Sequence, residues 1–237
     1  MTTDTTTETA ERSDASVDLY WLPLGAGGRS VRLNGRVYEA AAARLARRPA
    51  CDIYHSALEV RLPDGRFIIE MTPVPDGDGG ARGVVAEGPV GTRLAGRLRI
   101  FRYEVRCWRD GVIPDVAEAV ESPRPLSDDP ACARRVLQLV PSVPTPVWGR
   151  DEVGGGEMWN SNSLISWLIA RAGLDTDRIG PPEGGRAPGW KPGLVVARRQ
   201  QARPALVGQR ETMPPEPKPS SPPSKERAER TAVQHEI

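Results

Sequence analysis

Histidine is scarce in this sequence, with His55 and His235 as the only two, and cysteine is limited to three residues. Cys51, Cys107 and Cys132 follow no metal-ligand spacing, and their odd number argues against a disulfide framework. We therefore expect structural cysteines in a reducing, cytoplasmic compartment. No cofactor signal is present, so we expect neither a metal nor an organic cofactor.

The chain also lacks long apolar runs and a strong charge of either sign. No apolar run approaches the ~20 residues of a membrane-spanning helix, and no basic segment followed by an apolar run marks a signal peptide. The formal net charge is +1, which provides no electrostatic footprint for nucleic acid. We expect neither a transmembrane segment nor a nucleic-acid partner.

Glycine and proline are abundant instead, with 24 residues of each, a composition typical of a GC-rich bacterial genome. Residues 1–16 are rich in Thr, Asp, Glu and Ser, and residues 200–237 contain the run PPEPKPSSPPSKER. Both segments are predicted to be disordered tails. Residues 17–199 remain for one domain with a core. The proline-rich tail either docks a protein partner or is a plain disordered tail.

Hydrophobic alternation predicts a small antiparallel sheet. The clearest pattern is a β-hairpin, with strands at 51–62 and 66–72 joined by a turn at Pro63-Asp64-Gly65. A short strand is expected at 18–24, and a half-buried strand at 97–108 with one irregularity near Phe101. Loops are expected at 73–89 and 179–193, and a last short strand at 194–197.

Helical periodicity predicts three segments that pack on this sheet. They span residues 34–48, residues 131–140 after a cap at Asp128 or Asp129, and a helix beginning at Asn160 or Ser161 and closing at Gly173. The expected fold class is therefore α+β, with a small antiparallel sheet packed on helices.

Ser161 is the first candidate for chemistry. It shares a helical face with Leu164, Ile165 and Leu168, so its hydroxyl should point inward from the first turn, with the positive end of the helix dipole behind it. Ser163 should lie on a more exposed face. The alternative is that both serines only cap the helix.

His55 and Glu70 are the second and third candidates, on the two strands of the hairpin. A carboxylate within FIIEM is costly to bury without a partner, and the imidazole of His55 could be that partner. A two-residue turn at Asp64-Gly65 would place Glu70 opposite Glu59, so a contact with His55 requires a bulge or an off-centre loop. The alternatives are a hydrogen-bonded core histidine and a glutamate paired with an arginine.

The motif Tyr54-His55-Ser56-Ala57-Leu58-Glu59-Val60, followed by Asn160-Ser161-Asn162-Ser163, resembles a known family. The order of a histidine strand, an acid on the next strand and a nucleophile at a helix start is similar to the circularly permuted papain-like hydrolases of the NlpC/P60 type. These include YiiX-like proteins, lecithin:retinol acyltransferase-like proteins and PPPDE isopeptidases. The resemblance spans about residues 17–199.

This resemblance implies a hydrolase or acyltransferase for amide or ester bonds, with a small-molecule, lipid or peptide substrate. It implies Ser161 as nucleophile, His55 as general base and Glu70 as the residue that orients the ring. The flanking Trp159, Asn160, Asn162 and Ser163 would support the site.

The family has Cys where this chain has Ser161, and an alcohol is far less acidic than a thiol. Two other hypotheses therefore stay open. One is a catalytically inactive papain-like module that binds a peptide, lipid or protein. The other is a structural protein. Separately, four arginines either bind an anionic substrate or form a solvated strand face: Arg97, Arg99, Arg102 and Arg106.

Overall fold

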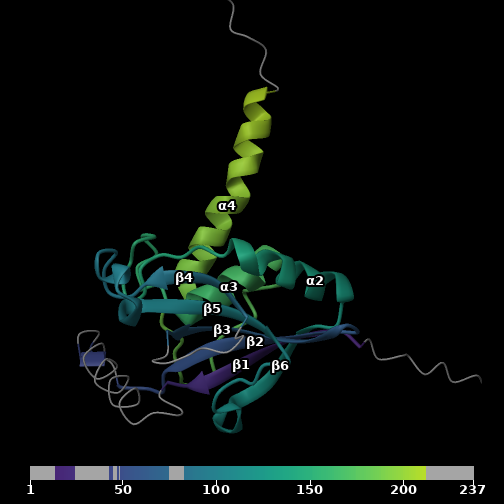
Figure 1. Ribbon diagram of the computed structural model, residues 1–237, viewed down its shortest axis with the longest axis horizontal. Coiled ribbons are helices and arrows are strands. Elements are labelled where there is room, and N and C mark those ends of the chain that lie inside the picture. Colours follow the sequence, from purple (N-terminus) through teal and green to yellow (C-terminus); the bar gives the residue numbers. More distant parts are fainter. Residues whose placement is uncertain (1–13, 25–42, 45–46, 48, 75–82, 212–237) are drawn as a thin grey trace, which may run out of the picture. The chain divides into compact units, whose positions relative to one another are not determined.

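The computed structural model describes residues 14–24, 43–44, 47, 49–74 and 83–211. Within them the chain forms a six-stranded antiparallel sheet in the order β4-β5-β3-β2-β1-β6, as Figure 1 shows. The strands are β1 (Ser16–Pro23), β2 (Tyr54–Leu62), β3 (Gly65–Pro73), β4 (Val84–Pro89), β5 (Arg102–Arg109) and β6 (Val120–Ser127). The mixed α+β class is confirmed. The helix expected over 34–48 lies largely outside the described residues.

The β2–β3 hairpin is confirmed, but its turn is one residue earlier than predicted. Leu62 pairs with Gly65, so the two turn residues are Pro63 and Asp64. Gly65 has φ 152°, and a Cβ there would lie only 2.9 Å from the Nε of Arg109. Glycine is therefore suited to this strand start.

Two predicted helices are present with their predicted caps. Helix α2 (Pro130–Leu139) begins after Asp129, whose carboxylate accepts from the backbone N–H groups of the first turn. Helix α3 (Ser161–Ala172) begins after Asn160 and ends at Gly173, which has φ 85°. Glycine adopts this left-handed conformation without a steric penalty.

The predicted strand at 194–197 is wrong, because these residues belong to helix α4 (Trp190–Glu211). A short apolar run cannot be assigned to strand or helix by its periodicity alone, and a proline, here Pro192, is tolerated in the first turn. The helix also continues beyond residue 199, although compact packing of the main unit ends at Ala202.

The strand predicted at 97–108 is present only in its second half, as β5. Its first half forms two 3-10 turns, η1 (Ala95–Arg97) and η2 (Arg99–Phe101). Two further 3-10 turns are η3 (Val116–Glu118) and η4 (Val140–Ser142). Strands β4 and β6 were not predicted. Both lie at sheet edges, where the prolines of β6 are tolerated.

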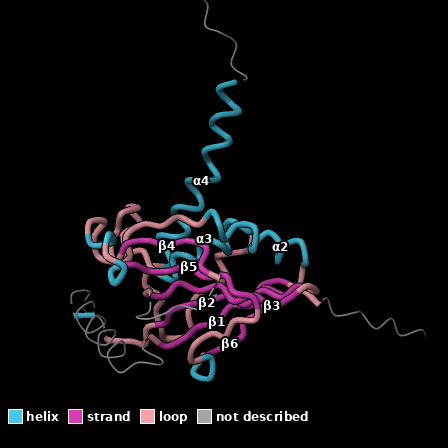
Figure 2. The backbone as a smooth tube through the Cα atoms, viewed as in Figure 1, coloured by secondary structure: helices cyan, strands magenta, loops and turns pink. Residues whose placement is uncertain are grey.

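Helices α2 and α3 cover one face of the sheet and enclose the main hydrophobic core (Figures 1 and 2). A smaller apolar cluster on the opposite face includes Tyr20, Leu22 and Ala57. Helix α3 is buried on almost every side, so the prediction of an exposed Ser163 face is wrong. The reason is α4, because Trp167 of α3 donates from Nε1 to Gln200 at 2.8 Å. No described helix combines the length and apolarity that a membrane span requires.

Candidate functional site

Strands β2 and β3 separate part of the way along their length, and a cavity opens there. They pair from Leu62 and Gly65 as far as Leu58 and Ile69. Beyond that point β2 is paired with β1, while β3 continues along β5. The cavity has a volume of about 250 Å³. Its wall is formed by Leu22, Leu24, His55, Ser56, Ala57, Glu70, Met71, Thr72, Pro73, Pro114, Asp115, Trp148 and Ser161.

All three predicted site residues thus line one cavity, although they reach it from two sides. Ser56 and Leu58 face helix α3, so their alternating neighbours His55 and Ala57 face the opposite side of the sheet. Ser161 approaches from the α3 side. Because β2 and β3 are not paired here, the cavity passes between them and is lined from both faces of the sheet.

Ser161 is 5% exposed and begins helix α3. Within the described residues its hydroxyl has no hydrogen bond to another protein group. Its neighbours are fully engaged: the side chain of Asn160 accepts from the Asn162 backbone at 2.9 Å and donates to the Pro188 carbonyl at 2.8 Å. Ser163 Oγ donates to the Gly189 carbonyl at 2.6 Å. Of these first-turn hydroxyls, only that of Ser161 remains for the cavity.

Asn162 connects the start of helix α3 to strand β2. Its Oδ1 accepts from Ser56 Oγ at 2.8 Å, and its Nδ2 donates to the carbonyls of Tyr54 and Pro188 at 2.9 and 2.8 Å. The side chain is 2% exposed. Asn160, Asn162 and Ser163 were predicted as support residues, and they hold Ser161 without lining the cavity themselves.

The first turn of α3 also leaves one backbone donor available. The first N–H groups of a helix have no partner within the helix. Those of Asn162, Ser163 and Leu164 all donate to Asn160, at 2.9, 3.0 and 3.2 Å. The N–H of Ser161 is left at the positive end of the helix dipole.

His55 is half-buried and its charged form is disfavoured. Desolvation lowers the pKa of its imidazole to about 4, and the carboxylate of Asp115 opposes this by raising the pKa. His55 is therefore neutral at pH 7. A neutral imidazole can accept a proton, although a pKa near 4 makes it a weak base.

Asp115, which sequence reasoning missed, is the acid whose charge acts on His55. It lines the cavity after Pro114 and has φ 57°, a left-handed conformation that is uncommon for residues other than glycine, asparagine and aspartate. The Pro-Asp dipeptide indicates a turn. No local pattern around Asp115 indicates that it acts on His55, which lies 60 residues earlier on β2.

Glu70 has a different partner from the one predicted by the resemblance. The register places it opposite Arg106 of β5 and, when extended by one step beyond Leu58 and Ile69, level with Ala57. Arg106 Nη1 lies 3.2 Å from Glu70 Oε1, and Arg106 also pairs with Glu104 at 2.9 Å. Burial raises the pKa of Glu70, and Arg106 opposes that rise. The alternative of an arginine-paired glutamate describes this geometry.

Trp159 packs in the main core, fully buried, and does not line the cavity. Its backbone forms a bridge with Trp148, which does line the cavity. Trp159 therefore supports the wall from behind. No local pattern in the sequence indicates that Trp148 lines a cavity.

None of the three cysteines lines this cavity. Cys51, Cys107 and Cys132 form no disulfide with one another. Burial raises the pKa of Cys107 to about 11, so its thiol is unreactive at neutral pH. Within the described residues, no three His, Cys, Asp or Glu side chains gather to hold a metal ion.

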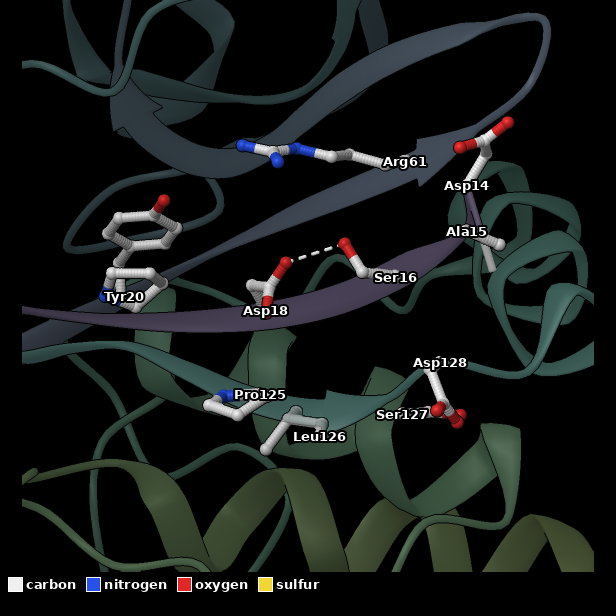
Figure 3. A pocket seen from close by; sticks show the side chains of 11 residues that line it. Asp14, Ala15, Ser16, Asp18, Tyr20, Arg61, Pro125, Leu126, Ser127 and Asp128 are labelled. Carbon is white, nitrogen blue, oxygen red and sulfur yellow. Dashed lines mark hydrogen bonds between the residues drawn. The ribbon is translucent and has the colours of Figure 1, made fainter. Parts of the chain in front are cut away.

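A larger open groove of about 810 Å³ lies along β1 and β6 (Figure 3). Ser16 donates to Asp18 at 2.6 Å within it, and Arg61, on its wall, pairs with Glu59. The groove contains no histidine or cysteine. Of the two, the smaller cavity is the one that combines a hydroxyl with an imidazole.

Comparison with known proteins identifies no relative: the chain matches no family model, no curated protein and no solved structure.

Proposed function

We propose that the chain is a hydrolase or acyltransferase that acts on amide or ester bonds at the cavity between β2 and β3. The observation that carries the proposal is the hydroxyl of Ser161, held at a helix start by fully bonded neighbours and left without a protein partner inside a cavity shared with His55. Preorganisation of this kind is typical of a nucleophile.

In the proposed reaction Ser161 Oγ attacks the substrate carbonyl while His55 accepts the hydroxyl proton. The backbone N–H of Ser161 donates to the oxyanion that forms. Collapse breaks the bond to the leaving amine or alcohol, which takes the proton from His55. Water or a second acceptor then releases the acyl group from Ser161 by the same steps.

Asp115 takes the part that the resemblance assigns to Glu70. A charge on His55 during attack is stabilised by a nearby carboxylate, and Asp115 acts on His55 in this direction. Glu70 is instead neutralised by Arg106. The order of His strand, following strand and helix supports a permuted papain-like arrangement, with serine in place of the family cysteine.

The second candidate function is a catalytically inactive module that uses the same cavity to bind a ligand. A pKa of about 4 for His55 favours it, because a general base works best with a pKa near the operating pH. In this function Ser161 and His55 hydrogen-bond a bound peptide or small molecule.

Labelling with a biotinylated fluorophosphonate separates the two functions. The enzyme predicts covalent labelling of wild type that is lost in Ser161→Ala and strongly reduced in His55→Gln. Ser142→Ala, which alters an exposed hydroxyl bonded only to the Leu139 carbonyl, is the matched control and should label normally. Two results together would favour the binding module. The first is a fully folded wild type that fluorophosphonate never labels. The second is a Ser161→Cys variant that reacts with iodoacetamide only when His55 is present.

A further inference from the structure

The connection between β4 and β5 exposes an unusual amount of apolar surface. Leu94, Leu98, Ile100 and Phe101 are 69, 60, 66 and 44% exposed. They lie within eight residues, in and beside the turns η1 and η2. Figure 2 draws this connection as loop and short helical turns beyond the strand ends. We call residues 94–101 the apolar turn. A concentration of large exposed apolar side chains marks an interaction surface.

Arginines alternate with these side chains. From Gly88 to Tyr103 the sequence has four arginines and no acidic residue. Arg93 is paired with Glu152 at 2.8 Å, and Arg102 with Glu87 at 3.0 Å. Arg97 and Arg99 form no ion pair or hydrogen bond with any described residue, and both are exposed. Two unneutralised cations therefore lie directly between the apolar residues.

This interleaving indicates which partner the surface fits. At the centre of a protein–protein interface, each arginine would need a matching acid from the partner, because a buried unpaired cation is costly. At an anionic lipid surface the same arginines extend to the phosphates while their apolar neighbours enter the acyl boundary. Phosphates are present at every position of such a surface, so no matched carboxylates are required.

We propose that the apolar turn, residues 94–101, docks the protein peripherally on an anionic phospholipid surface. The backbone anchors the turn to the folded unit, since Phe101 accepts from the N–H of Val90 at 2.8 Å and Gly91 donates to Trp148 at 3.0 Å. Docking needs no membrane-spanning helix. It is independent of the chemistry proposed for Ser161.

Flotation of the full chain with vesicles tests this proposal. We expect binding to vesicles of phosphatidylcholine with 30% phosphatidylglycerol, at least tenfold weaker binding to pure phosphatidylcholine, and loss of binding as salt is raised. Leu98→Ser/Ile100→Ser should weaken anionic binding at least tenfold. Arg97→Gln/Arg99→Gln should weaken it by a similar factor and flatten the salt dependence. Val112→Ser, which changes a 63% exposed side chain outside the turn, is the matched control and should bind as wild type does.

Circular dichroism should show that every variant is folded. Three results would overturn the proposal. The first is wild-type protein that stays with the soluble fraction at every vesicle concentration. The second is variants that float as wild type does. The third is concentration-dependent dimerisation that Leu98→Ser/Ile100→Ser abolishes in the absence of vesicle binding, which would assign the surface to a second copy of the chain.

Discussion

Ser56 and Asn162 are joined by a buried hydrogen bond of 2.8 Å between Oγ and Oδ1. Ser56 is the chain neighbour of His55, and Asn162 is the chain neighbour of Ser161. The bond therefore ties strand β2 to the first turn of α3 at the point where the two candidate reactive residues meet one cavity. This contact therefore helps to fix the positions of His55 and Ser161 relative to each other.

Replacing Asn162 should loosen this connection. Asn162→Ala removes an acceptor for Ser56 and donors to the Tyr54 and Pro188 carbonyls, and leaves buried polar groups unsatisfied. We expect a loss of about 2–4 kcal/mol in the free energy of unfolding, measured by urea denaturation. Ser142→Ala should change it by less than ~0.5 kcal/mol. Equal stability of the two variants would contradict the structural role of Asn162.

The lowered pKa of His55 predicts a pH dependence of stability. Because the folded pKa of about 4 lies below the unfolded value, the unfolded chain binds the proton more tightly. Above about pH 6.5 His55 is neutral in both the folded and the unfolded chain, so its titration does not lower the stability. As the pH falls toward 4, proton binding by the unfolded chain lowers the free energy of unfolding. The loss is on the order of 2–3 kcal/mol. Urea unfolding at pH 7 and pH 4.5 should show a smaller difference for His55→Gln than for wild type.

Nuclear magnetic resonance gives a direct check of the same pKa. The sequence has only two histidines, so their ring signals are readily assigned with the His55→Gln variant. A titration midpoint near 6.5 for His55 would show that desolvation does not control its charge.

Arg106 should be far more important for stability than Arg102, although both lie on β5. Arg106→Met removes the buried guanidinium that pairs with the carboxylates of Glu70 and Glu104. We expect a loss of about 3–5 kcal/mol at pH 7. The loss should shrink as the pH is lowered, because burial already raises the pKa of Glu70 and protonation removes the uncompensated charge. Arg102→Met, which breaks a pair with both partners 38% exposed, should cost under ~1 kcal/mol.

Gly189 should be intolerant of a side chain. A Cβ there would lie 2.3 Å from the Asn160 Oδ1 that caps α3, and φ is +87°. Gly184 has a similar φ of +74° with open space around it, so Gly184→Ala isolates the backbone strain of roughly 1–2 kcal/mol. Gly189→Ala should lose about 1 kcal/mol more, the cost of a disturbed cap. It should also reduce fluorophosphonate labelling, whereas Gly184→Ala should not.

The sequence was sufficient for elements with strong local signals. The β2–β3 hairpin follows from its Pro-Asp-Gly turn, and α3 follows from Asn160 at one end and Gly173 at the other. The register was shifted because Gly65 begins the strand instead of completing the turn. A shift of one residue in the turn changes the partner of Glu70, and no local pattern decides it.

The remaining features depend on contacts between distant segments. Arg106 has the same alternation as a solvated arginine, yet it is 7% exposed because Glu70 and Glu104 surround it. Asp115 acts electrostatically on His55 only because the fold brings the two residues to one cavity. Strand β6 was missed because Pro123 and Pro125 are unfavourable in strands, and only a position at the sheet edge permits them.

Those two prolines also limit self-assembly of the protein. Each lacks the backbone N–H that a regular ladder of strand hydrogen bonds requires. At the far edge, β4 is short and irregular, with a register shift between Val84 and Ala86. Neither border of the sheet is therefore a regular template for cross-β growth, and the chain can keep a wide sheet without forming fibrils through its edges.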